Sequence, residues 1–124
     1  MLDVLCAGFA CLDLTLRLPH HPAPDEKLAA TGLVHSGGGP AANAAVQIAR
    51  LGGRAGFLGR LGNDPFGQHL LAQFATEGID TSACVITPEP TPLAVILTKP
   101  DGTRNALGNR PPAPPLADPA ALLA

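Results

Sequence analysis

Apolar and polar side chains alternate strictly over residues 12–18, and a short apolar run over residues 4–7 precedes them. A period of two is typical of a half-exposed strand, and a short apolar run that ends at a glycine is typical of a buried one. We therefore expect two strands at the start of the chain. A third, weaker strand is expected over residues 27–35, after a loop that holds two Pro and two His.

The next segment, residues 40–51, has the period of a helix. Asn43, Gln47 and Arg50 are its polar members among Ala, Val, Ile and Leu, and they fall on one helical face. This pattern predicts a mostly buried helix. Gly52 follows it and is expected to end it by supplying a positive φ.

A buried strand is expected over residues 55–62, followed by a second helix. Asp64 can cap that helix, Pro65 suits its first position, and Gly78 closes it. The apolar face of the helix is expected to consist of Phe66, Leu70, Leu71 and Phe74. The order strand, helix, strand, helix predicts right-handed βαβ units, and therefore an α/β fold with a largely parallel sheet covered by helices.

The last third of the chain carries further strand signals. A short strand is expected over residues 83–87, and a strand pair over residues 93–98 and 104–107, joined by the turn sequence Pro-Asp-Gly-Thr. Such a hairpin fits a sheet edge or a lid. Residues 109–124 are rich in Pro, which predicts an extended or disordered tail.

Composition narrows the class of protein. With 124 residues, 46% hydrophobic and 15% charged, the chain fits one globular domain or a piece of one. A net charge of −2, no Trp and no Tyr leave neither a phosphate-binding surface nor base-stacking platforms, so we expect no nucleic-acid partner. Cys6, Cys11 and Cys84 form no CxxC pair, and no apolar run is long enough to span a membrane. We therefore expect a soluble, cytoplasmic protein.

A glycine-rich motif carries the main functional signal. The sequence Gly-Gly-Pro-Ala-Ala-Asn-Ala-Ala begins at Gly38, and Gly52 and Gly62 follow at fixed spacing. Consecutive glycines let backbone N–H groups approach a ligand closely, and the N-terminus of the following helix adds a favourable dipole. A polyhydroxylated ligand suits such a corner.

This motif resembles the N-terminal signature of the ribokinase/pfkB carbohydrate kinases. The resemblance extends over residues 8–13 upstream, 62–67 and 101–104 downstream, and covers residues 2 to about 108. It implies a three-layer α/β/α fold with a mostly parallel sheet and a small β lid, of which this chain holds only the N-terminal part. The lid strands would be residues 12–18, 27–35 and 93–107, within a kinase-like part spanning residues 1–108.

The resemblance also implies which residues bind the sugar. These are Asp13, whose carboxylate would accept hydrogen bonds from hydroxyl groups, the hinge glycines Gly38 and Gly39, and Asn43. Two of them have plainer explanations: Asp13 as a solvated strand residue, and Asn43 as part of the polar helix stripe. Asp64 is explained as a helix cap, and the four histidines as surface residues. Ribokinase-like sequences often carry Asn at the position of Cys11, and some carry Lys at the position of Pro40, so the resemblance leaves the identity of the sugar open.

ATP and Mg²⁺ are the cofactors that the family implies, but their residues are expected outside this chain. The family's Gly-Ala-Gly-Asp turn, with its general base and anion hole, does not occur in the sequence, and neither does a GxxxxGK[ST] loop. We therefore expect a sugar-binding half without catalytic residues, inactive alone. One alternative to this interpretation is a non-catalytic sugar-binding or dimerising relic of a kinase, which could form a homodimer through the lid strands. The other is an unrelated nucleotide-binding protein, which the absence of a GxGxxG motif disfavours.

Overall fold

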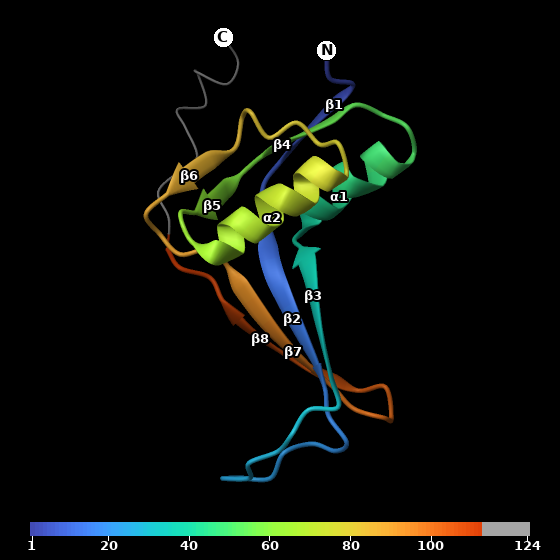
Figure 1. Cartoon of the computed structure of the whole chain (residues 1–124), viewed down its shortest axis with the longest axis vertical. Coiled ribbons are helices and arrows are strands. Elements are labelled where there is room, and N and C mark those ends of the chain that lie inside the picture. The colour runs from blue at the N-terminus through green and yellow to red at the C-terminus, as the bar shows by residue number, and fades with distance from the viewer. Residues whose placement is uncertain (113–124) are drawn as a thin grey trace.

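The computed structural model describes residues 1–112 and shows an α/β body with a β-sheet extending from one end (Figure 1). The elements are, in chain order, β1 (Val4–Ala7), β2 (Cys11–Arg17), β3 (Gly32–Gly38), α1 (Pro40–Arg50), β4 (Ala55–Leu58), β5 (Arg60–Gly62), α2 (Pro65–Thr76), β6 (Val85–Thr87), β7 (Leu93–Thr98) and β8 (Arg104–Asn109). Neither helix is long and apolar enough to cross a membrane.

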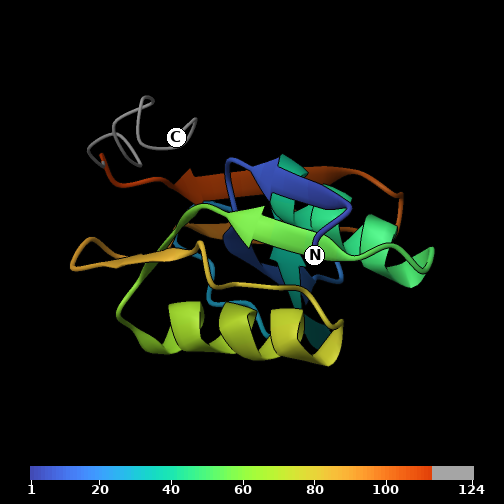
Figure 2. The ribbon, with the colours of Figure 1, turned by 90° about the horizontal axis from the view of Figure 1, so that it is seen from above.

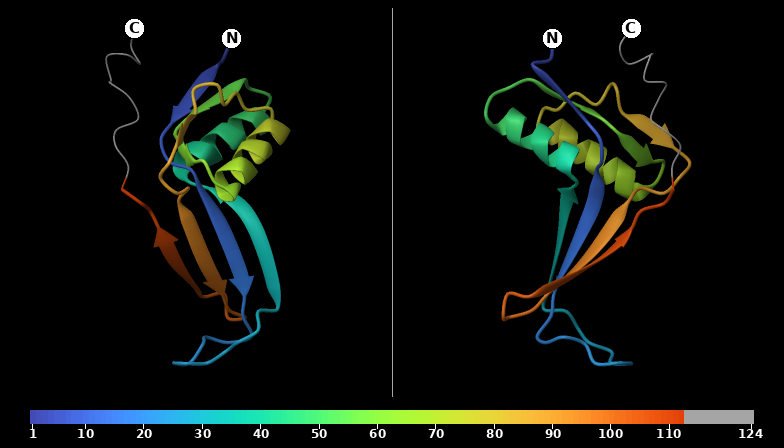
Figure 3. Two further views of the ribbon diagram at one scale, coloured as in Figure 1. Left: turned by 60° about the vertical axis from the view of Figure 1, so that its left-hand side comes forward. Right: turned by 180° about the vertical axis from the view of Figure 1, so that it is seen from behind.

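The body is built on short parallel strands. β1 pairs with β4 in register from Val4 opposite Ala55 to Ala7 opposite Leu58, and β5 pairs with β6. Both helices lie on the same side of the β1–β4 pair (Figures 2 and 3). The described residues therefore contribute two short pairs of parallel strands, a parallel bridge between Gly56 of β4 and Asp80, and one of the two helical layers that the fold class predicts.

The lid is a four-stranded mixed sheet in the order β3-β2-β7-β8. β2 runs antiparallel to β3 and parallel to β7, and β8 returns antiparallel to β7 as the predicted hairpin. The strand predicted over residues 27–35 exists, but its bounds are wrong, because β3 spans Gly32–Gly38. Pairing with β2 sets the bounds of β3, because the ladder ends with Gly38 opposite Cys11. Gly37 and Gly38 are therefore part of the strand and do not end it.

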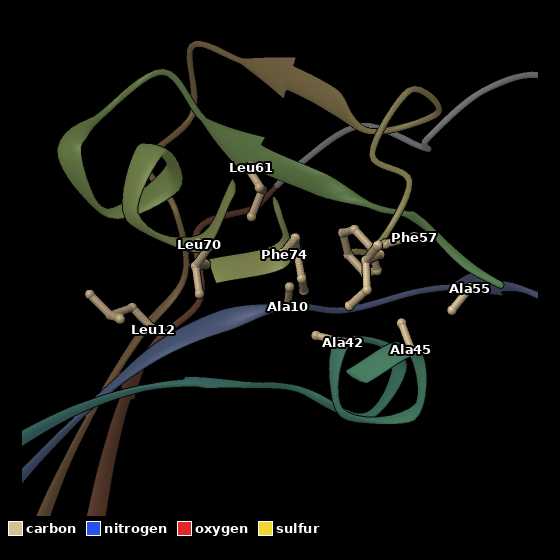
Figure 4. Close-up of a cluster of buried hydrophobic side chains, with 10 residues drawn as sticks. Ala10, Leu12, Ala42, Ala45, Ala55, Phe57, Leu61, Leu70 and Phe74 are labelled. Atoms are coloured by element: carbon tan, nitrogen blue, oxygen red, sulfur yellow. The ribbon is translucent and has the colours of Figure 1, made fainter. Parts of the chain in front are cut away.

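The core lies between the helices and the body strands (Figure 4). It consists of Ala10, Leu12, Ala42, Ala45, Ala55, Phe57, Leu61, Leu70, Phe74 and Ile79. The alanines let α1 lie close to β4, while the rings of Phe57 and Phe74 fill the centre at 4.9 Å between centroids. The predictions of both helices and of their caps are confirmed, including the positive φ of 90° at Gly52.

Two expectations about burial are wrong. Only Ala42 and Ala45 of α1 are buried, because this helix forms an outer layer and contacts strands on one face alone. Phe66 is 38% exposed, since the core-facing line of α2 runs through Gly67, Leu70 and Phe74.

The expected strand over residues 55–62 is divided at Gly59, where a Cβ atom would lie 2.5 Å from the carbonyl oxygen of Gly8.

Candidate functional site

The base of the lid brings two of the expected site residues into direct contact. Cys11 pairs with Gly38 and Asp13 pairs with Ser36, so Asp13 and Gly38 are diagonal neighbours on the same face of the sheet. The Asp13 carboxylate lies directly over Gly38, and any Cβ atom at that position would overlap its Oδ2 atom. A glycine is therefore required at position 38 for the carboxylate to occupy this place.

Cys11 holds the same carboxylate from the strand itself. Its side chain is buried and its thiol donates a hydrogen bond from Sγ to Asp13 Oδ1 at 3.2 Å. Burial, followed by the hydrogen bond and the negative charge of Asp13, raises the pKa of the Cys11 thiol to about 12. The thiol is consequently protonated at neutral pH and acts as a donor.

Gly39 forms the corner between lid and body. It is the N-cap of α1 with φ of 99°, a conformation that favours glycine, and a Cβ atom there would overlap the carbonyl oxygen of Phe9. Its carbonyl oxygen accepts the first helical hydrogen bond from the N–H of Asn43 at 2.9 Å. The first turn of α1 contains no acidic residue, so the positive end of the helix dipole is not neutralised by its own sequence.

Asn43 makes no hydrogen bond to the Asp13 carboxylate. Its exposed side chain lines a cavity of about 450 Å³ between α1, α2 and the end of β3, together with His35, Gln73 and Arg50. Within residues 1–112 that side chain makes no hydrogen bond to protein. Asp13, Gly38 and Gly39 thus meet at one corner, while Asn43 opens into the neighbouring cleft between the helices.

Arg110 is a residue that the sequence analysis missed. Its guanidinium carbon lies 3.9 Å from the centroid of the Phe9 ring, and its positive charge acts to lower the pKa of Cys11. Phe9 and Arg110 also line a cavity of about 520 Å³ with Gly8, Ala10 and Pro92. No local sequence signal marked it, because β8 continues to Asn109, opposite Leu93, two residues beyond the strand end that the sequence predicts, and this places Arg110 at the base of the lid.

Asp64 has a second role besides the cap that the sequence predicts. Its Oδ1 atom accepts hydrogen bonds from the Gly67 N–H at 2.8 Å and the Thr91 hydroxyl at 2.6 Å, and its Oδ2 accepts the Thr91 N–H at 2.8 Å. Partial burial opposes ionisation, but these hydrogen bonds hold the pKa of Asp64 below its usual value. Since Thr91 comes just before β7, Asp64 ties the lid to the start of α2.

Comparison with known proteins shows the family to which the chain is related. The pfkB family carbohydrate kinase model matches residues 1–122. A 5-dehydro-2-deoxygluconokinase of Geobacillus kaustophilus is 38% identical over 81 residues, which is 65% of this chain and 23% of that protein.

Solved kinases share the same fold. Fructokinase from Xylella fastidiosa with bound ATP superposes with a TM-score of 0.71 at 36% identity, over 89% of this chain and 33% of that one. Ribokinase from Cryptococcus neoformans in complex with ADP gives a TM-score of 0.71 at 31% identity, over 85% and 33% of the two chains. The chain thus spans about a third of the length of these solved kinases.

The fold, together with the glycine corner, is that of the ribokinase-like small-molecule kinases. Within that class, the chain belongs to the pfkB family of carbohydrate kinases.

Proposed function

We propose that this chain supplies the acceptor-sugar half of a carbohydrate kinase site, and that the sugar binds at the base of the lid. The observation that carries the proposal is the placement of the Asp13 carboxylate over Gly38, beside the corner at Gly39. A carboxylate accepts hydrogen bonds from two vicinal hydroxyl groups, and a backbone without side chains lets a ring approach closely. This combination suits a polyhydroxylated ligand.

Further groups around the corner support a sugar ligand. Phe9 presents an apolar ring beside the site and Arg110 a fixed cation, which together would contact a sugar ring and an oxygen substituent. Asn43 remains a predicted contact, to be made by a sugar that extends towards the start of α1. A ketose of the fructose type and a deoxyketogluconate are the substrate classes that the names of similar kinases suggest.

Phosphoryl transfer to a sugar hydroxyl is the activity we propose for the whole kinase. Within residues 1–112 no three His, Cys, Asp or Glu side chains gather where they could hold a metal ion, so we assign no Mg²⁺ ligand to this part. Residues 1–112 contain no GxxxxGK[ST] sequence either, and we assign them the acceptor side only. A chain that binds sugar without catalysis is the second candidate, because the carboxylate and glycine corner would serve it equally well.

Sugars should stabilise the chain through Asp13. At a sugar concentration of ten times Kd, we expect about 1.4 kcal/mol of stabilisation and a rise in Tm of roughly 5 °C. Thermal unfolding with a panel of pentoses, ketohexoses and sugar acids measures this shift. Asp13→Asn should abolish it, because the amide lacks the second acceptor oxygen.

The matched control for that experiment is Asp25→Asn. Asp25 lies exposed in the loop before β3, and asparagine tolerates its φ of 59°. This variant should keep the full sugar-dependent shift. A panel that leaves the Tm of the unaltered chain unchanged would contradict the proposed function.

A further inference from the structure

Cys11 is held against the one carboxylate of the candidate site. The two residues are two positions apart on β2, so their side chains lie on the same face of the lid sheet. Sγ lies 3.2 Å from Asp13 Oδ1, and Cys11 is only 8% exposed. The thiol therefore reaches the carboxylate from the buried end of the strand.

The two oxygen atoms of Asp13 have different surroundings as a result. Oδ1 accepts the thiol hydrogen, and Oδ2 lies over the Cα atom of Gly38, where no side chain competes for it. A carboxylate has about four lone-pair sites, so several remain for a ligand. The hydrogen bond from the thiol favours one orientation of the carboxylate.

We propose that Cys11 is a positioning residue, whose thiol fixes the orientation of the Asp13 carboxylate for the sugar. The inference rests on the proposed function and extends it to a residue that does not touch the ligand. A side chain that is already held in its bound orientation loses less conformational freedom on binding, which tightens the complex. The protonated state of Cys11 at neutral pH is consistent with this role, since only the thiol can donate.

The alternative explanation is that Cys11 only fills space in the core. A serine distinguishes the two, because its hydroxyl donates a hydrogen bond but fills less volume than a thiol. If Cys11 only packs, serine and alanine should both lower the stability of the chain and leave the affinity for sugar unchanged. If it positions Asp13, alanine should weaken binding and serine should restore it.

The experiment measures binding of D-fructose and D-ribose to the whole chain by calorimetry, for the unaltered protein, Cys11→Ala and Cys11→Ser. We expect Cys11→Ala to raise Kd about tenfold and Cys11→Ser to remain within about twofold of the unaltered protein. Equal affinity of the alanine variant and the unaltered chain would overturn the inference, as would a serine variant as weak as alanine. Failure of the unaltered chain to bind either sugar would count against the proposed function instead.

A second measurement tests the contact without any sugar. The ionisation of Cys11 is followed by ¹³C NMR of its Cβ atom, in a chain where Cys6 and Cys84 are replaced by alanine. The thiol should stay protonated to about pH 10 in this chain, and Asp13→Asn should move its ionisation to lower pH by removing the carboxylate charge. An unchanged titration after Asp13→Asn would show that the carboxylate and the thiol do not interact.

Discussion

Asp64→Ala is expected to lower the free energy of unfolding by about 3 kcal/mol, as measured by urea denaturation. The substitution removes a helix cap and leaves the N–H and hydroxyl of Thr91 without their acceptor. Thr91 is only 2% exposed, so water replaces this acceptor poorly. The lid should lose order together with the start of α2.

Asp80→Ala is the control for this substitution. Asp80 Oδ1 also accepts a backbone hydrogen bond, from the N–H of Ser82 at 2.8 Å, but the residue is exposed. We expect this variant to lose about 1 kcal/mol or less. Similar losses for the two variants would show that Asp64 acts as an ordinary turn residue and does not tie the lid to the body.

The contribution of Asp64 should depend on pH in a defined direction. Because its pKa is lower in the folded chain than its ordinary value of 3.8, the ionised carboxylate stabilises the fold above that pH. The contribution is lost as the pH falls through the folded-state pKa. The difference in unfolding free energy between the unaltered chain and Asp64→Asn should therefore narrow below about pH 4.

Gly39→Ala is expected to cost about 3 kcal/mol and to remove sugar binding. The new Cβ atom would overlap the Phe9 carbonyl oxygen and lie 2.8 Å from the Cα atom of Ala10, which are both backbone groups that cannot turn away. The backbone at φ of 99° is also unfavourable for alanine. To relieve the steric overlap and the unfavourable φ together, the corner between the lid and the body would have to open.

Gly52→Ala separates these two costs. Gly52 has a similar φ of 90°, but a Cβ atom added there would meet no other atom within 4 Å. This variant should therefore show the conformational cost alone, about 1 kcal/mol. Urea denaturation of both variants gives the comparison. If Gly39→Ala is no more destabilising than Gly52→Ala, the close approach of Gly39 to the Phe9 carbonyl is not a requirement of the fold.

The sequence predicts those elements best whose signals are local. Pro65 behind Asp64 defines the start of α2, and the Asp-Gly turn at residues 101–102 defines the β7–β8 hairpin. β3 could not be placed in the same way, because its bounds follow from pairing with β2 and glycine has low strand propensity. Its strand character is therefore visible only in the tertiary structure.

In the candidate site, too, some features follow from local sequence and others depend on the tertiary structure. The family signature predicts that Asp13 and Gly38 belong to one site, and the two residues do lie in contact. The contact from Cys11 to Asp13 could not be predicted without knowing which way the side chains point along β2. Arg110 escaped notice because the proline-rich sequence after it suggested a tail, while its position depends on the end of a strand. The placement of Asn43 likewise depends on how α1 lies beside α2.

The most direct test of the sugar site is a titration of the ¹⁵N-labelled chain with D-fructose and D-ribose, followed by amide chemical shifts. Binding at the base of the lid should move the signals of residues 11–13 and 37–39 with one saturable Kd, and Asp13→Asn should remove the effect. Shifts confined to the cleft between α1 and α2, around Gln73 and Thr76, would contradict the account. So would shifts that do not saturate.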